Sequence, residues 1–243
     1  MSRRISRGAI VVAGVVYFLL HLPVLVLVVF SVNASRYSVE WTGFTLEWYR
    51  RLGDRADLLR GLEASLIVGT VSTVVATVFG TLLALAVARG RFRGRRAIEG
   101  FLYMPIVTPE IIVGISSLVL FVLLKIPLGL GTITIAHIAF NIAFVAVVVR
   151  ARLDGMDRSL EEAALMLGAD EFTAFRTVTV PQLWPGIVAG ALLAFTMSFD
   201  DYVITSLVAG PGSSTLPVVV YGMVRLNVEP TINAISTLIL LAT

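Results

Sequence analysis

Three acidic residues stand within long apolar stretches, where a charged side chain is costly unless it has a partner or reaches water. They are Glu110, Asp200 and Asp201. One interpretation is that these carboxylates line the path of a positively charged solute through a membrane. The other is that they cap interrupted helices or pair with a partner chain. Because adjacent residues on a helix point about 100° apart, at most one of the two aspartates would squarely face such a path.

A second chemically distinctive segment is polar and connects two apolar runs. It reads Ser-Leu-Glu-Glu-Ala-Ala-Leu-Met-Leu-Gly from Ser159 to Gly168. Ser159 followed three residues later by Glu162 is a capping-box pattern, in which the hydroxyl and the carboxylate satisfy amides of the first turn. Ala163 and Ala164 are strong helix formers, and Gly168 suits the left-handed backbone position after a helix end. The segment therefore predicts a short capped helix.

A second short helix is predicted directly after this one. Asp170 is placed to cap it, and we expect it to run through Arg176 and to end before Pro181. Leu160, Ala164 and Leu167 then share one side of the first helix, at helical spacing. Such a helix–turn–helix could be an ordinary capped loop or a docking element for another protein.

The motifs for several kinds of chemistry are absent from this sequence. No Gly-x-x-x-x-Gly-Lys-Ser/Thr phosphate loop occurs, so nucleotide would have to bind a partner chain. Neither Gly-x-Ser-x-Gly nor His-Glu-x-x-His is present, which argues against an intramembrane hydrolase. There is no cysteine, and His21 and His137 stand in apolar surroundings without metal-ligand spacing. We expect both histidines to be packing or interfacial residues, and we expect no catalytic residue, metal site or cofactor in this chain.

The composition is that of a membrane protein. Hydrophobic residues make up 57% of the 243 residues and charged residues only 14%, well below the roughly 25% of an average soluble domain. A helix needs about 20 residues to cross a bilayer. Runs of suitable character are found at about 9–31, 62–88, 99–124, 132–149 and 186–208, followed by 216–229 and a last run from 231.

The orientation follows from the basic residues, which concentrate in the cytoplasmic segments of membrane proteins. Arginines cluster before the first run, between residues 89 and 96, and between residues 150 and 176. With a cytoplasmic N-terminus, all three clusters lie inside, although the first outer segment, with five arginines beside four acidic residues, fits less well. We interpret the 89–96 cluster as a signal that fixes orientation, in preference to a nucleic-acid or anionic-lipid site.

The polar segment resembles the cytoplasmic "EAA" loop of permease subunits in ATP-binding-cassette importers. Glu162-Ala163-Ala164, three residues, Gly168, nine residues and then Val178-Thr179-Val180-Pro181 follow that order and spacing. In that family the loop docks on the ATPase subunit and transmits its motion. The resemblance implies that Glu162, Ala163, Ala164, Gly168 and Pro181 couple the chain to an ATPase.

The resemblance also implies a fold and a set of partners. The fold would be an all-α type I importer permease with about six spans, a single transmembrane domain over residues 1–243, and the coupling loop at 151–185. The partners would be a second related permease, an ATP-binding-cassette ATPase dimer that binds the ATP, and an extracytoplasmic solute-binding protein. The chain would lie in the lipid of a bacterial inner membrane, bind no nucleic acid and not itself be an enzyme.

Other stretches are similar to permeases of spermidine/putrescine importers. They are Met104-Pro105 with Pro109-Glu110, Phe199–Thr205 with Gly210-Pro211-Gly212, and Thr215–Arg225 with Pro230 and Asn233-Ala234. The resemblance therefore implies a polyamine substrate, with Glu110, Asp200 and Asp201 in its path. Ferric iron, a sugar or a phosphonate are the alternatives within the class. An ion-driven secondary transporter and a non-transporting membrane scaffold are the alternatives outside it.

The last apolar run is short for a membrane span. Residues 231–243 would form about 20 Å of helix, against a hydrocarbon core of about 30 Å. We expect the last span to be truncated here and the natural protein to continue by about ten residues or more.

Overall fold

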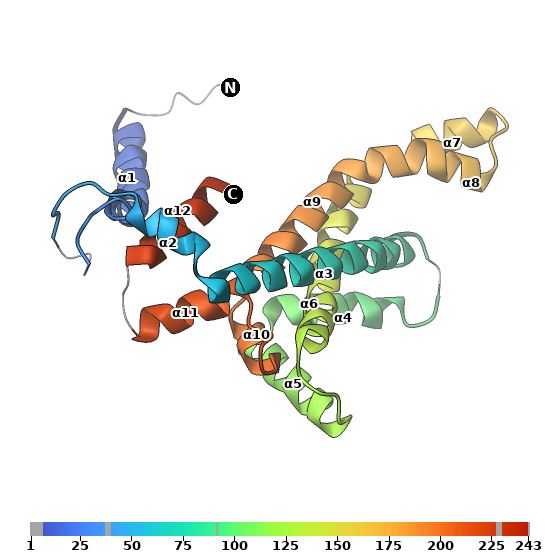
Figure 1. Ribbon diagram of the computed structural model, residues 1–243. Coiled ribbons are helices and arrows are strands. Elements are labelled where there is room, and N and C mark those ends of the chain that lie inside the picture. The colour runs from blue at the N-terminus through green and yellow to red at the C-terminus, as the bar shows by residue number, and fades with distance from the viewer. Residues whose placement is uncertain (1–6, 37–39, 91, 227–229, 243) are drawn as a thin grey trace. The chain divides into compact units, whose positions relative to one another are not determined.

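The structure is a computed structural model that describes residues 7–36, 40–90, 92–226 and 230–242 (Figure 1). The chain divides into two compact units, one formed by residues 1–59 and 219–243 and the other by residues 60–218. Regular structure in the described ranges is helical apart from a single antiparallel bridge between Asn33 and Phe44. The elements are α1 (Arg7–Phe30), α2 (Glu47–Gly53), α3 (Ala56–Arg89), α4 (Arg95–Val107), α5 (Glu110–Leu123), α6 (Leu130–Asp154), α7 (Ser159–Met166), α8 (Glu171–Ala174), the π-helical turn η1 (Phe175–Thr179), α9 (Val180–Asp200), α10 (Val203–Val208), α11 (Leu216–Leu226) and α12 (Pro230–Ala242).

In the first unit, α12 packs against both α1 and α2. The bridge beside Asn33 is held by that residue's side chain, which is fully buried. Its Nδ2 donates to the Glu40 carbonyl at 2.7 Å, and its Oδ1 accepts from the Thr42 amide at 3.0 Å. Trp48 of α2 donates its indole N–H to the Asn33 carbonyl at 2.7 Å. These bonds fix the turn that follows α1, because a buried polar group needs a partner.

The core of the second unit lies where α3 and α9 pack against α6. A Cβ on Gly80 of α3 would lie 2.7 Å from the Val145 Cβ of α6, so only glycine permits this approach. Small residues allow such close contact between helices in membranes. The main cluster of buried apolar residues consists of Ala76, Ala84, Val87, Leu102, Val145, Ala146, Val149, Leu183 and Ala194. A second cluster, around Phe121, Ile133 and Ile204, joins α5, α6 and α10.

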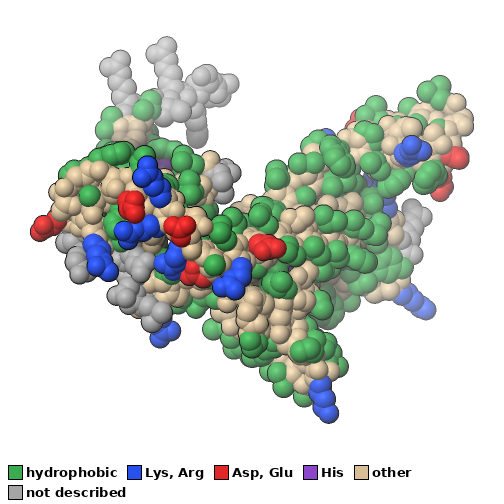
Figure 2. Space-filling model, in the orientation of Figure 1, with side chains coloured by type: hydrophobic (Ala, Val, Ile, Leu, Met, Phe, Trp, Pro, Cys, Tyr) green, Lys and Arg blue, Asp and Glu red, His purple; other side chains and the backbone are tan. Residues whose placement is uncertain are grey.

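Four helices in the described residues are long and apolar enough to cross a membrane, and a bent pair makes a fifth candidate. The four are Gly8–Phe30, Ala56–Arg89, Leu130–Asp154 and Glu171–Asp200, and α11 and α12 are shorter apolar helices. The sequence predicted about six spans, and the number agrees approximately. Many large hydrophobic side chains of these helices are exposed and recur across the visible face of the molecule, as expected for contact with lipid or other subunits (Figure 2).

The predicted third span is not one straight helix. It divides into α4 and α5, which meet at an angle of 108°. The break falls at Thr108, whose backbone is extended at φ −74° and ψ 130°. The ring of Pro109 clashes with a helical conformation of the preceding residue, so a bend at this position has a direct cause. Pro105, by contrast, is accommodated within α4.

The predicted fifth span is also interrupted, and it begins earlier than expected. α8, η1 and α9 form one span from Glu171 to Asp200, after which Asp201 is extended at φ −67° and ψ 125° and α10 begins at Val203. The prediction that a helix ends before Pro181 is therefore wrong. Pro181 lies in the first turn of α9, directly after the π-helical turn, where its missing N–H is best tolerated.

Candidate functional site

The predicted coupling helix is present as α7, but it begins differently from the capping-box prediction. Arg158 precedes the helix and its side chain makes no cap hydrogen bond. Ser159 is the first helical residue, and its amide donates to the Asp157 carboxylate at 2.9 Å. Glu162 is exposed and makes no capping bond to Ser159 in the described structure. The capping-box prediction is wrong because the helix begins one residue earlier, with Arg158 at the N-cap, and Asp157 accepts from the Ser159 amide in place of Glu162.

The end of α7 is as predicted. Gly168 has φ +93°, the left-handed conformation that glycine adopts without strain. The Gly168 amide donates to the Leu165 carbonyl at 3.0 Å, and the Ala169 amide donates to the Ala164 carbonyl at 3.1 Å. This pair of bonds is a Schellman motif. It turns the chain sharply and sets up α8, whose start is capped by Asp170 accepting from the Thr173 amide at 2.6 Å. Hydrogen bonds from Thr173 lower the pKa of the Asp170 carboxyl.

An ion pair that the sequence did not predict fastens α7 to the end of α3. Both guanidinium nitrogens of Arg89 donate to Glu161, at 2.8 and 2.6 Å, and the Thr179 hydroxyl donates to the same carboxylate at 3.0 Å. Burial favours a raised pKa for Glu161, but the hydrogen bonds from Arg89 and Thr179 outweigh it and lower the pKa. We call Arg89, Glu161 and Thr179 the coupling clamp. Bidentate pairs of this kind fix geometry as well as adding energy.

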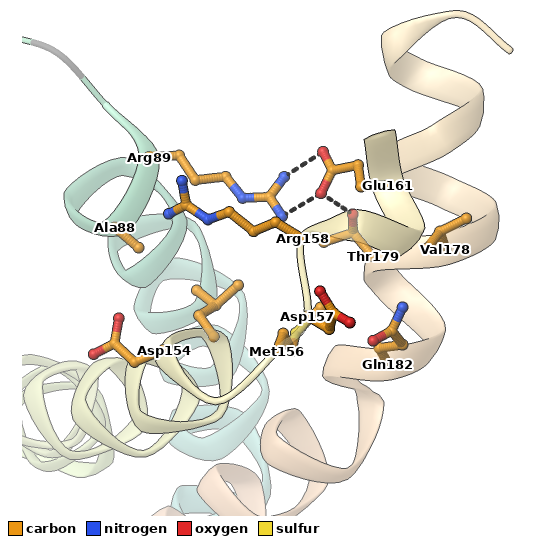
Figure 3. Close-up of a pocket in the computed structure, with 11 residues that line it drawn as sticks. Ala88, Arg89, Asp154, Met156, Asp157, Arg158, Glu161, Val178, Thr179 and Gln182 are labelled. Carbon is orange, nitrogen blue, oxygen red and sulfur yellow. Dashed lines mark hydrogen bonds and ion pairs between the residues drawn. The ribbon is translucent and has the colours of Figure 1, made fainter. Parts of the chain in front are cut away.

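A shallow, open pocket lies beside the coupling clamp. Figure 3 shows Arg89 extending toward Glu161, while the Arg158 side chain lies alongside Arg89 with its guanidinium directed away from Glu161, and Asp157 and Gln182 lie below the pair. The pocket is lined by Ala88, Arg89, Leu153, Asp154, Met156, Asp157, Arg158, Glu161, Val178, Thr179 and Gln182. The clamp thus joins α3 and α7 to the π-helical turn before α9, next to the end of α6.

The tip of the loop exposes large apolar side chains to an unusual degree. Met166 is 91% exposed, Leu167 89% and Phe172 70%. Leu160 and Leu165 of α7 are also exposed, and α7 has no buried residue. We call Met166, Leu167 and Phe172 the apolar tip. Because exposed clusters of large apolar residues mark interaction sites, this arrangement fits a docking element better than an ordinary loop.

The three predicted pathway acids lie at helix ends. Glu110 is the exposed first residue of α5, and Asp200 is the exposed last residue of α9. Asp201 is different, because its side chain is 8% exposed and caps α10. α5 and α10 are neighbours: a Cβ on Gly114, one turn after Glu110, would lie 3.3 Å from the Ile204 Cα. The acids therefore belong to adjacent elements, and Asp201 matches the helix-capping interpretation.

His137 is more than a packing residue. It is 2% exposed, and its ring nitrogens lie within hydrogen-bonding distance of Ser198, Asp201 and Thr205. Neither this contact nor the coupling clamp leaves a local signal in the sequence, because the partners are between 18 and 72 residues apart. The one sign in the sequence that His137 has a structural role was its position as a polar residue within an apolar run. Arg89 was assigned only to the orientation signal.

Comparison with known proteins gives consistent matches. A family model described as binding-protein-dependent transport system inner membrane component matches residues 76–243. The chain is 41% identical over 240 residues to the spermidine/putrescine transport system permease protein PotC of Escherichia coli K12, covering 99% of this chain and 90% of that protein. It is also 41% identical to the putrescine transport system permease protein PotI of the same organism, covering 97% and 86%.

Solved structures show the same fold at low sequence identity. A chain of a bacterial ABC transporter that imports the acidic polysaccharide alginate has a TM-score of 0.73 at 18% identity, covering 98% of this chain and 94% of that one. A chain of an amino acid ABC transporter has a TM-score of 0.64 at 18% identity, covering 82% and 94%. At these identities the likeness concerns the fold alone.

Proposed function

Because this chain belongs to the family of binding-protein-dependent transport system inner membrane components, we propose that it is the permease subunit of an ATP-driven importer of a polyamine such as spermidine or putrescine. The observation that carries the proposal is the 41% identity to PotC over 99% of the chain. The exposed carboxylates of Glu110 and Asp200, on neighbouring broken helices, support a cationic solute. Ionisable groups at membrane depth commonly mark such a path.

The proposed machine contains four kinds of subunit. A second, related permease completes the path, two ATP-binding-cassette ATPase subunits bind the nucleotide, and an extracytoplasmic binding protein delivers the solute. This chain lies in the bacterial inner membrane with its N-terminus in the cytoplasm, carries no cofactor and catalyses no reaction. The clustering of Arg89, Arg150, Arg152 and Arg158 around the coupling end of the second unit supports this orientation, because cytoplasmic ends of spans are rich in arginine.

The coupling loop is proposed to convert ATPase motion into alternating access. The apolar tip docks on the ATPase, with Glu162, Ala163, Ala164, Gly168 and Pro181 in the segment that forms the docking element. ATP binding closes the ATPase pair, and the coupling clamp carries the displacement of α7 into α3 and α9. Rigid-body motion of packed helices then opens the path alternately to each side of the membrane.

The interrupted helices do not favour an ion-driven secondary transporter over this proposal. Broken spans are typical of secondary transporters, and the chain has two of them, α4–α5 and α9–α10. The family match decides between the two classes, since the family is defined by dependence on a binding protein.

Reconstitution of the whole complex in liposomes tests the proposal. We expect labelled spermidine or putrescine to be taken up only with ATP and the binding protein, and Glu110→Gln and Asp200→Asn to lower that uptake. Glu161→Gln is the control variant, because Glu161 is distant from these acids. We expect it to impair coupling and to leave the solute preference unchanged. Uptake of only neutral or anionic solutes would eliminate the polyamine substrate and leave the importer. Uptake driven by an ion gradient without ATP would eliminate the importer.

A further inference from the structure

The break between α9 and α10 is held by a single carboxylate. Asp201 Oδ1 accepts from the Ile204 amide at 3.2 Å, and Oδ2 accepts from the Thr205 amide at 2.7 Å and from the Thr205 hydroxyl at 2.8 Å. The first amides of a helix have no partner within it. In the six-residue α10 they would otherwise be left unpaired among buried residues, since Ile204 and Thr205 are almost completely buried. The cap is therefore essential to the start of α10.

Asp201 is in turn held from outside by a buried histidine. His137 Nε2 of α6 lies 3.1 Å from Asp201 Oδ2, and Nδ1 lies 2.6 Å from the Ser198 hydroxyl of α9. An ionised carboxylate can only accept, so Nε2 must carry the proton that it donates to Asp201. The Ser198 hydroxyl in turn lies 3.0 Å from the Ser72 hydroxyl of α3, within hydrogen-bonding distance.

This chain of hydrogen bonds joins four helices at one point. His137 comes from α6, Ser198 from α9, Ser72 from α3, and Asp201 holds the start of α10. All four side chains are at least nine-tenths buried. Buried polar networks whose members are all satisfied make a structure rigid. Asp200, one residue before the cap, is exposed and has no part in the network.

We propose that His137 is a positioning residue that fixes Asp201 as the cap of α10. The α9–α10 break then keeps one geometry, and Asp200 is the aspartate that remains available to contact solute. The statement about solute rests on the proposed function. The statement about positioning does not, because it concerns only the backbone amides of α10 and the residues that hold their cap.

Two substitutions of His137 test the contacts of its two ring nitrogens separately. In His137→Gln the side-chain amide can occupy the place of Nε2 and still donate to Asp201. In His137→Asn the amide reaches only as far as Nδ1, so the contact with Ser198 can persist while the contact with Asp201 is lost. Both replacements are polar and uncharged, so a difference between them reports the lost contact and not general polarity.

Hydrogen–deuterium exchange of the assembled, detergent-purified complex measures the positioning directly. We expect exchange in the segment containing Ile204 and Thr205 to rise roughly tenfold or more in His137→Asn, because a charge-assisted hydrogen bond to the cap is lost. His137→Gln should stay within about threefold of wild type, as expected for a conservative donor replacement. Unchanged exchange in His137→Asn, or equal increases in both variants, would overturn the proposal.

Transport supplies the second readout. We expect His137→Asn to lower kcat for spermidine uptake more than it raises KM, and Asp200→Asn to raise KM without changing exchange at α10. If His137→Asn fails to assemble, Thr205→Val takes its place, because valine keeps the shape and loses the hydroxyl that contacts Asp201. No increase in exchange in Thr205→Val would then count against the proposal. If the exchange results are as expected but neither the wild type nor any variant transports polyamine, the proposed substrate is wrong and the positioning role stands.

Discussion

The coupling loop and the α9–α10 break are both polar interruptions of apolar helices, but they are built in opposite ways. At the break, Asp201, His137 and Ser198 are buried and satisfied by one another. At the loop, the ion pair is partly exposed and the side chains of the apolar tip are between 70% and 91% exposed. The break is therefore satisfied within the chain, whereas the loop leaves apolar side chains exposed for the partner that we propose. Substitutions at the loop should therefore affect assembly, and those at the break should affect the chain itself.

The largest effect that would test this contrast is expected at the apolar tip. Leu167→Asp should reduce capture of the ATPase subunit by tenfold or more, because a buried unpaired charge at a docking site is costly. Leu167 is 89% exposed, so the isolated chain should insert and melt as wild type does. Pull-down of the ATPase and thermal melting measure the two properties. Leu167→Met is the control, and equal capture by both variants would mean that the tip is not the docking element.

A smaller effect is expected at the turn that aims the tip. Gly168 has φ +93°, and a β-branched residue there is strained by about 1–2 kcal/mol. Gly168→Val should therefore misplace α7 relative to α8 and lower transport severalfold while the protein still inserts. Gly168→Asn is the matched control, since asparagine tolerates this conformation better than valine. Full transport by Gly168→Val would show that the turn geometry has no part in coupling.

The smallest effect is expected from Glu161 and should depend on pH. Because the pKa of Glu161 is lowered in the folded protein, the coupling clamp stabilises the protein fully above the ordinary glutamate pKa of roughly 4.3 and loses this contribution as pH falls through the lowered folded-state pKa. The pair is a quarter to a third exposed, so we expect at most about 1 kcal/mol. Thermal melting of Glu161→Gln should show a loss at pH 7 that shrinks toward pH 3.5. A loss of equal size at both values would contradict the charge-based explanation.

The features that could be predicted from the sequence are local ones. Gly168 after a run of helix formers indicated the left-handed turn, and Asp170 indicated the second cap, because both depend on residues a few positions away. The apolar runs indicated a helical membrane fold for the same reason. Roles for Glu162 and Pro181 in coupling, and for Glu110 and Asp200 in the solute path, stay predictions.

The failures have equally physical causes. The capping box did not form because the carboxylates of Asp157 and Glu162 compete for the Ser159 amide, and sequence spacing does not rank them. Pro181 did not end a helix because the π-helical turn directly before it accommodates the proline and lets the helix continue. The coupling clamp and the His137 network join residues far apart in the chain, so they could not be foreseen before the helices were packed.

The π-helical turn has a mechanical consequence. By continuing the helix past Pro181, it makes one rod of the 30 residues from Glu171 to Asp200. At 1.5 Å per residue that rod is about 45 Å long, with the apolar tip at one end and the α9–α10 break at the other. We infer that it acts as a lever: a tilt of about 10° around its middle would move each end by roughly 4 Å. A tilt of that size imposed at the end that carries the apolar tip would thus displace the α9–α10 break by about the same distance.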